Sequence, residues 1–431
     1  MKRITLDFDR ARTFLDKDRI ETARHHATEA WQSLLERRGP GSEWLGWMDL
    51  LAEPDTEELR RLEQEAAEIR KDADILVVCG IGGSYMGSRA IRDCLKGMSA
   101  RSGVDLRFAG HHMGSRAHHQ LVKELEEPRA DGTPKSIWLN VISKSGTTLE
   151  TALAFNWLRS WMEERYGEHE AAQRIIATTD PNHGALRELA RQKGYRTGSI
   201  DGDVGGRFSV LTAVGLLPIA VAGGNIHALV SSASSACHSL IQDPEPLLEF
   251  ASVRYLLHEA GYGVDLISAF DPDLEGLVGW LQQLLGESEG KQGKGLFPAR
   301  AIYSTDLHSI GQFVQEGQRL MMETVIDVLE DVEPLIPVVG KQEGPLGYLS
   351  GKSLHEINRQ ALEGTLAAHH QGGVPVVRIK LQRLDEETLG EFLCLFEFLT
   401  AVYGYMLGVN PFDQPGVEAY KTEMYRRLGR L

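Results

Sequence analysis

Short apolar runs that end at glycine or hydroxyl residues and lead into helical patterns constrain this chain more than any other feature. They lie at 74–79, 104–108, 136–142 and 174–178, with helical patterns between them. Strands that are joined through helices form a parallel sheet covered on both faces. The sequence therefore predicts an α/β layer domain in this part of the chain.

A similar alternation returns later in the sequence. Strands are expected at 263–268 and 373–379, and helices near 210–222, 274–285, 307–324, 354–368 and 384–407. We therefore expect a helical N-terminal arm over 1–70, a first α/β domain over 71–200, a second over 201–409, and a C-terminal helix within 410–431 that packs back on the active site.

Composition argues against several classes of function. The 431 residues carry a formal net charge of -15, which disfavours general binding to nucleic acid. We recognise neither a signal peptide nor an apolar run of the roughly 18 residues that span a membrane. The four cysteines form no CxxC pair, so we expect reduced thiols in a cytoplasmic protein. No spacing of His and Cys typical of a zinc site occurs, and no metal is expected.

Hydroxyl side chains cluster where the apolar run at 136–142 ends and the next helical pattern begins. The cluster consists of Ser143, Ser145, Thr147 and Thr148, with Lys144 and Gly146 among them. The free N–H groups and the dipole of a helix N-terminus attract anions, and hydroxyls donate to phosphate oxygens. One Ser or Thr suffices for an ordinary helix cap. The stretch therefore predicts a phosphate-binding loop.

A glycine-rich turn, Gly80-Ile81-Gly82-Gly83-Ser84, follows the run at 74–79. A dinucleotide fingerprint would need glycine at the position of Tyr85, so we do not expect a nicotinamide cofactor. Ligands of parallel sheets bind beyond the carboxyl ends of the strands. Gly83 and Ser84 are therefore expected near the hydroxyl cluster, although a plain β–α turn explains the glycines equally well.

Four further residues, in three segments, have both a catalytic and a structural interpretation. Glu287 and Glu289 end a helical pattern; one of them could act as an acid or base if partly desolvated, whereas a solvated helix end is the simpler explanation. Arg207, beside two glycines, could pair with a phosphate or an oxyanion, or satisfy backbone carbonyls. His308 opens a helical pattern, and a lone histidine is more often structural than catalytic.

Taken together, these segments resemble the glucose-6-phosphate isomerase (phosphoglucose isomerase) family in its shorter bacterial type, over nearly the whole chain. The matching pieces are 80–84, 143–148, 203–211, 286–291, 304–308 and 410–421. The hydroxyl cluster alone marks only a SIS-type (sugar isomerase) phosphate domain, whereas Gly-Gly-Arg at 205–207 and Phe-Asp-Gln-Pro-Gly-Val-Glu at 412–418 are more specific. The resemblance implies two doubly wound α/β/α SIS-type domains with mainly parallel sheets.

The resemblance also implies an aldose–ketose isomerase of glycolysis and gluconeogenesis that interconverts glucose 6-phosphate and fructose 6-phosphate. It implies a homodimer without metal or cofactor. By position, it assigns the phosphate to Ser143, Lys144, Ser145, Thr147 and Thr148, with Gly83 and Ser84 near it. It makes Glu287 the base, Arg207 the cation beside the enediolate, His308 and Lys421 the ring-opening pair, and Gln283 and Gln414 substrate contacts. His308 would come from the neighbouring subunit.

Two other functions would share the phosphate site. A non-catalytic sugar-phosphate-binding protein would need no Glu287, His308 or Lys421, and all three are present. An isomerase of a related phosphosugar would differ in the pocket around C2. Neither alternative involves nucleic acid or a membrane.

Overall fold

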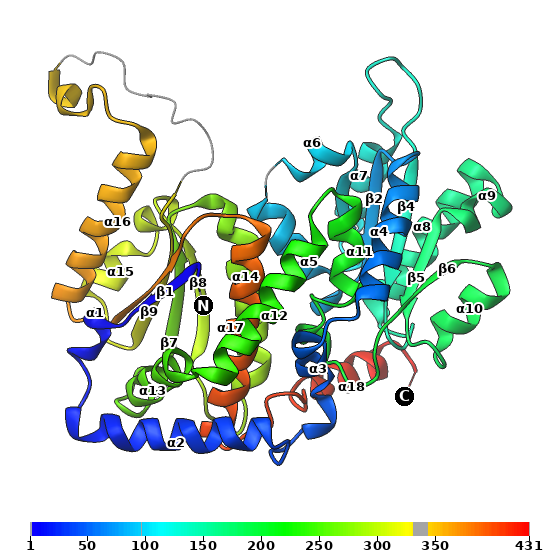
Figure 1. Cartoon of the computed structure of the whole chain (residues 1–431). Helices are drawn as coiled ribbons and strands as arrows, with labels where there is room; N and C mark the ends of the chain where they lie inside the picture. The colour runs from blue at the N-terminus through cyan, green and yellow to red at the C-terminus, as the bar shows by residue number, and fades with distance from the viewer. Residues whose placement is uncertain (1, 96, 331–343, 431) are drawn as a thin grey trace. The chain divides into compact units, whose positions relative to one another are not determined.

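Two five-stranded sheets organise the chain, one in each of the two units into which the computed structural model divides (Figure 1). The structure describes residues 2–95, 97–330 and 344–430. Unit 1 comprises Met1–Ser42 and Ser235–Leu431, and unit 2 comprises Glu43–Ser234. This division differs from the expected segments because α2 (Lys17–Leu35), in the N-terminal arm, packs on helices from the C-terminal half. The α/β fold class with mainly parallel sheets is confirmed.

Unit 2 is built on an all-parallel sheet of order β3-β2-β4-β5-β6. Its strands are β2 (Ile75–Cys79), β3 (Asp105–Ala109), β4 (Ile137–Ile142), β5 (Ile175–Thr179) and β6 (Arg196–Ser199). Its helices are α3 (Gly46–Ala52), α4 (Thr56–Arg70), α5 (Gly83–Cys94), α6 (Met98–Ser102), α7 (Ser115–Glu126), α8 (Leu149–Tyr166), α9 (Glu168–Gln173), α10 (Ala185–Lys193), α11 (Ala213–Val221) and the first part of α12 (Ile226–Gln242). The strand order reverses between β2 and β4, which is where ligands of such sheets bind.

Burial on both faces explains why the central strands of unit 2 were predictable. Every residue of β2, β4 and β5 is buried. Alternate residues of a strand point to opposite faces. Ile75, Val77 and Cys79 join the core cluster that contains Phe155 and Leu158 of α8, while α5 and α11 also contact β2. A strand covered twice is apolar along its whole length, and its sequence shows an unbroken apolar run.

Unit 1 has a mixed sheet of order β1-β10-β9-β7-β8, in which only the edge strand β1 is antiparallel. Its strands are β1 (Ile4–Asp7), β7 (Val264–Ala269), β8 (Phe297–Ile302), β9 (Met321–Val328) and β10 (Val376–Leu381). Its helices are α1 (Asp9–Arg12), α2, the remainder of α12, α13 (Glu245–Glu259), α14 (Glu275–Glu289), α15 (Gly311–Glu316), α16 (Leu354–Gln371), α17 (Glu386–Met406) and α18 (Val417–Arg427).

Two expectations for unit 1 are wrong. The N-terminal arm is not wholly helical, because Ile4–Asp7 pairs with the otherwise open edge of β10. The helix expected at 307–324 is instead a 3-10 turn, η4 (Thr305–His308), then the short helix α15, and then the strand β9. Gly317 follows α15 directly, and β9 takes its place between β7 and β10 in the middle of the sheet.

The longest helix, α17, forms the core of unit 1. Among the described residues it alone is long and apolar enough to cross a membrane, and 94% of its apolar window is buried inside the protein. Its Phe396 ring packs on Phe250 of α13 and on Phe392, with centroid distances of 6.0 and 4.6 Å. We therefore assign α17 as a core helix.

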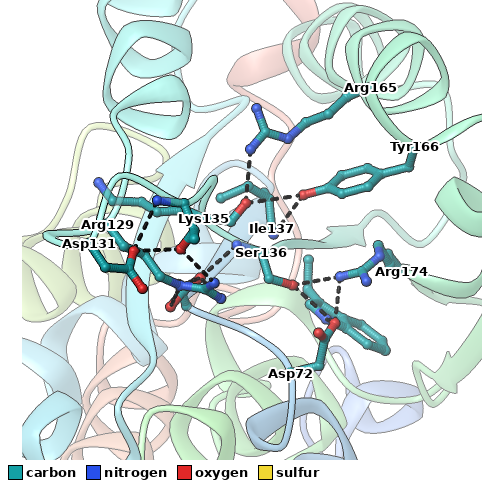
Figure 2. Close-up of polar contacts among 12 residues, drawn as sticks. Asp72, Arg129, Asp131, Lys135, Ser136, Ile137, Arg165, Tyr166 and Arg174 are labelled. Atoms are coloured by element: carbon teal, nitrogen blue, oxygen red, sulfur yellow. Dashed lines mark hydrogen bonds and ion pairs between the residues drawn. The ribbon is translucent and has the colours of Figure 1, made fainter.

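A network of polar side chains fixes the start of β4 (Figure 2). Asp72 accepts hydrogen bonds from Ser136 Oγ at 3.0 Å and Trp138 Nε1 at 3.3 Å, and its carboxylate lies 2.6 Å from Arg174 Nη1. The Ser136 amide donates to Asp74 at 2.6 Å. Because Ser136 directly precedes β4, these contacts set where the strand begins and hence where its carboxyl end lies.

Replacing Asp72 by Asn tests this network. Burial raises the pKa of Asp72, but hydrogen bonds from Ser136 and Trp138 and the charge of Arg174 outweigh it, and the pKa is lowered. Such a carboxylate stabilises the fold above its unfolded pKa of about 3.9, and this contribution disappears as the pH falls through the folded pKa. We expect the variant to lose roughly 1 kcal/mol or less of unfolding free energy at neutral pH, since solvent screens this half-exposed pair.

Urea unfolding of Asp72→Asn and wild-type protein at neutral pH and near pH 3 (about one unit below the unfolded pKa) measures the difference. The deficit should be largest at neutral pH and shrink in acid. A deficit that is the same at both pH values would contradict the charge of Asp72 as its cause.

Candidate active site

The hydroxyl cluster forms a loop at the carboxyl end of β4. The Ser143 side chain is buried, and its Oγ accepts a hydrogen bond from the Gly146 amide at 3.0 Å. Thr179 Oγ1, at the end of β5, donates to the Ser143 carbonyl at 2.8 Å. The sequence analysis did not single out Thr179; its position at the end of the neighbouring strand is the signal that could have found it. These bonds hold the loop in one conformation.

Gly146 is required by the shape of this loop. Its φ is +72°, and a Cβ there would lie 2.3 Å from the Leu186 backbone nitrogen. On either side of it, the exposed hydroxyls of Ser145 and Thr147 lie 2.9 Å apart. The loop therefore turns tightly and presents the hydroxyls of Ser145 and Thr147 to solvent.

The loop leads into the N-terminus of α8. Thr148 is the extended N-cap residue, and its side chain makes no capping hydrogen bond. The first N–H groups of a helix have no partner within the helix, and the dipole places partial positive charge there. Together with the hydroxyls of Ser145 and Thr147, this end of α8 has the chemistry of a phosphate site.

The Lys144 ammonium points away from the hydroxyls. Its Nζ donates to the Gly202 carbonyl at 2.7 Å and lies 4.7 Å from the centre of the Trp44 ring. Burial lowers the pKa of Lys144, and the carboxylates of Asp180, Asp203 and Asp201 oppose that shift. We infer that Lys144 favours an anion through its backbone and through long-range charge.

The glycine turn lies beside the loop and also touches the segment of Arg207. A Cβ on Gly80 would be 3.4 Å from the Ile142 carbonyl oxygen, and a Cβ on Gly83 would be 1.8 Å from the Gly206 carbonyl oxygen. The backbones meet where only glycine fits. Within unit 2 the structure therefore brings together the turn with Gly83 and Ser84, the hydroxyl loop and Arg207, whose side chain is buried.

In unit 1, Glu287 and both expected glutamines meet at the end of α14. Gln283 Nε2 donates to Glu287 Oε1 at 3.1 Å, and Gln414 Nε2 donates to Glu287 Oε2. Gln283 Oε1 is buried without a hydrogen-bond partner among the described residues. This oxygen could accept a hydrogen bond from a sugar hydroxyl. The arrangement fixes both oxygens of a half-buried carboxylate, as a general base requires.

The second carboxylate of this helix end is structural. Glu289 and Asp265 of β7 both pair with Arg254, and all three side chains are buried. Burial raises the pKa of Glu289, and Arg254 partly offsets this. Of the two carboxylates considered, Glu287 is therefore the candidate base, while Glu289 anchors the helix end to the sheet.

His308 and Lys421 are exposed or half-exposed in unit 1. His308 ends η4, and the described residues offer its ring no hydrogen bond. Lys421, on α18, lies 2.8 Å from Glu418, and this hydrogen bond raises the pKa of Lys421, which keeps the side chain cationic at neutral pH. The structure does not bring these two side chains together with Glu287 by any described contact.

Two contacts connect the segments that carry Glu287 and His308 to opposite ends of the strand β8. Gln282 Nε2, on α14, donates to the Pro298 carbonyl at 2.9 Å, at the start of β8. Asp306, in the turn of His308, accepts from the Ile302 amide at 2.7 Å, at the end of β8. From Pro298 to Ile302 the strand rises about 13 Å. The end of α14 and the turn of His308 are thus anchored at opposite ends of this strand.

A buried network, which the sequence analysis missed, supports the turn that carries His308. Tyr303 and Ser268 both donate to Glu323 Oε1 at 2.8 Å, and His369 Nδ1 lies 2.7 Å from Glu323 Oε2. Glu323 is fully buried in β9. A buried carboxylate with three partners is a rigid anchor. Its partners are far apart in the sequence, so no local pattern announces it.

The neighbouring histidines His111-His112 and His118-His119 are not part of any candidate metal site that the described residues form. Within the described part of the chain, no group of three or more His, Cys, Asp or Glu side chains could hold a metal ion. His111 stacks on Tyr85 at a centroid distance of 4.7 Å. Burial is the main cause that lowers the pKa of His111 to about 4, and His112 adds to it. The ring therefore packs as a neutral aromatic.

Comparison with known proteins connects this site to a family. Residues 61–322 and 343–427 match the family model described as phosphoglucose isomerase. A protein named glucose-6-phosphate isomerase from Staphylococcus aureus (strain Newman) is 43% identical over 439 residues, which cover 100% of this chain and 97% of that relative.

Two solved structures have a similar fold. A hypothetical protein from Thermus thermophilus superposes with a TM-score of 0.88 at 30% identity, covering 99% of both chains. A glucose-6-phosphate isomerase from Chlamydia trachomatis superposes with a TM-score of 0.80 at 18% identity, covering 100% of this chain and 89% of that chain. At that identity the second likeness bears on the fold alone.

Replacing Gly146 by Ala tests the anion loop directly. The new Cβ would press on the Leu186 backbone and displace the hydroxyls, so we expect affinity for inorganic phosphate to fall by roughly tenfold or more. Gly194→Ala is the matched control, because Gly194 has a φ of +73° with nothing near its missing Cβ. Both changes strain the backbone, but only the first should weaken phosphate binding in calorimetry. Equal losses in the two variants would contradict the loop as the binding site.

Proposed function

Because this chain belongs to the phosphoglucose isomerase family, we propose how its residues interconvert glucose 6-phosphate and fructose 6-phosphate. The observation that carries the mechanism is the Glu287 carboxylate, held by Gln283 and Gln414. A single carboxylate can serve both carbons of the reaction, since C1 and C2 are neighbours. The hydroxyl loop of unit 2 supplies the site for the phosphate.

Phosphate binding is the remote part of the mechanism. The hydroxyls of Ser143, Ser145, Thr147 and Thr148 and the free amides of α8 bind the phosphate, with Gly83 and Ser84 beside it. The energy of these contacts holds the sugar in register at the distant reacting carbons. Because the phosphate does not react, the loop serves both directions of the isomerisation equally.

Catalysis begins with opening of the sugar ring. His308 and Lys421 move a proton between the anomeric hydroxyl and the ring oxygen, which breaks the bond from C1 to the ring oxygen. Glu287 then removes the proton from C2 of the open-chain aldose, and the electron pair forms the C1–C2 double bond of a cis-enediol. A proton passes from the C2 hydroxyl to the C1 oxygen, which took up the negative charge, and the carboxylic acid returns its own proton to C1, so that C2 becomes the ketone.

Arg207 stabilises the charge that develops during proton transfer. Removing a proton from carbon leaves negative charge on the adjacent oxygen, and a fixed cation there lowers the barrier. The Arg207 side chain is only 3% exposed, so its position is set by packing. Gln283 and Gln414 orient the base and offer amide groups to the sugar hydroxyls.

We infer a homodimer from where the catalytic groups lie on unit 1. Ring opening and proton abstraction act on adjacent atoms of one sugar, yet the segments that carry Glu287 and His308 contact opposite ends of β8. We infer that each site combines Glu287 of one chain with His308 of its partner. We also propose that the protein works in the cytoplasm, where its four buried free cysteines would stay reduced.

The variant Glu287→Gln tests the base. The amide keeps the shape of the side chain but cannot accept the proton, so turnover of glucose 6-phosphate should fall by at least 10³-fold (order of magnitude). Binding of fructose 6-phosphate, measured by calorimetry, should change little. Turnover near that of the wild type would remove Glu287 from the mechanism. Turnover of mannose 6-phosphate in the same coupled assay, compared with that of glucose 6-phosphate, shows whether a related phosphosugar is the preferred substrate.

Mixing two inactive variants tests the shared site. Glu287→Gln and His308→Ala homodimers each lack one group in both sites, whereas a mixed dimer contains one site with both groups intact. After unfolding and refolding together, statistical pairing should restore about a quarter of wild-type activity. If His308 acts on the site of its own chain, the mixture stays inactive.

A further inference from the structure

We propose that Lys291 is a positioning residue for this reaction: it holds the loop before α18 against the end of α14, so that the amide of Gln414 reaches Glu287. The inference rests on the proposed function, because it assumes that Glu287 is the base. It adds a residue that neither contacts the sugar nor exchanges a proton.

The Lys291 side chain is almost wholly withdrawn from solvent, with 8% exposed. Its Nζ donates to the Asn410 carbonyl and lies 2.9 Å from Asp413 Oδ1. Burying an ammonium is costly unless it is paired and hydrogen-bonded. These two contacts therefore form a specific clamp between the residue after Gly290, at the end of α14, and the loop at 410–413.

The clamped loop leads directly to Gln414. Asn410 Oδ1 accepts a hydrogen bond from the Phe412 amide at 2.9 Å, and the buried Phe412 ring packs on Tyr405 of α17 with a centroid distance of 6.3 Å. Beyond Phe412 the chain emerges: Asp413 and Gln414 are exposed. Lys291 contacts the loop at Asn410, before the buried Phe412, and at Asp413, after it. Asp413 directly precedes Gln414.

The rest of unit 1 keeps the two ends of the clamp in place. Helices α14 and α17 pack side by side, and the loop follows α17 (Figure 1). Lys294 contacts the same region differently, since its Nζ donates to the Leu407 carbonyl at the end of α17 at 2.7 Å. Lys294 thus satisfies a helix end, whereas Lys291 holds the loop that presents Gln414. This difference makes Lys294 a matched control.

A double-mutant cycle tests the proposal. Lys291→Met should lower kcat by roughly 10- to 100-fold with KM changed little, because a base displaced by about 1 Å loses rate of this order. Gln414→Leu should lower kcat at least as far and also raise KM, because its amide contacts the sugar as well as the base. The double variant should be no slower than the slower single variant, since both changes remove one contribution. Lys291→Arg should recover part of kcat, and Lys294→Met should retain it.

Three outcomes would overturn the proposal: an unchanged kcat in Lys291→Met, losses that multiply in the double variant, or an equal loss in Lys294→Met. Should Lys291→Met fail to fold, Asp413→Asn replaces it in the cycle, because Asp413 is 46% exposed and its change buries nothing. Failure of the proposed base would be recognised separately, by an active Glu287→Gln variant, whatever the cycle shows.

Discussion

The parallel pairing of β2 with β4 is the constraint on which the phosphate site depends. Their register sets Cys79 opposite Val141, so the two strands end together, and the glycine turn and hydroxyl loop follow at one edge. A slip of one residue would turn every side chain of β4 to the other face. The polar network at Ser136 opposes such a slip from the other end of the strand. The anion site is thus specified by strand pairing before any of its hydroxyls is considered.

Unit 1 has the same kind of sheet but places its chemistry elsewhere. Its strand order reverses between β7 and β9, yet Glu287 lies at the end of α14, beside the start of β8. The C-terminus of a helix carries partial negative charge, which disfavours a carboxylate. The amides of Gln283 and Gln414 offset this by donating to both oxygens. Glu287 therefore depends on one partner from a distant part of the chain, Gln414, whereas the turn of the hydroxyl loop is formed by bonds among neighbouring residues and is then braced by Thr179.

This difference explains what the sequence could and could not predict. The loop at 143–148 was predictable because a buried strand, one glycine and the start of a helix are all local signals. The strand β9 was missed because it contains Glu323 and Asp327, buried charges that are stabilised by His369 and Arg378. Those partners are distant in sequence. Likewise the roles of Gln283 and Gln414 came only from family resemblance, and the clamp of Lys291 spans 119 positions to Asn410.

In the proposed mechanism, the buried ion pair of Arg254 and the clamp of Lys291 have a role beyond stability. A base that serves both C1 and C2 must act at two points only about 1.5 Å apart. A more mobile carboxylate would lose its alignment with one of the two carbons. If it stayed aligned only with C2, it would return the proton to C2 and no ketose would form. Arg254 anchors the end of α14 through Glu289, and Lys291 anchors the loop of Gln414. The fully buried pair of Arg254 and Glu289 moves little, because separating it leaves an unpaired ion in a medium of low dielectric. The proposed two-carbon transfer would therefore draw its precision from groups that do not contact the sugar.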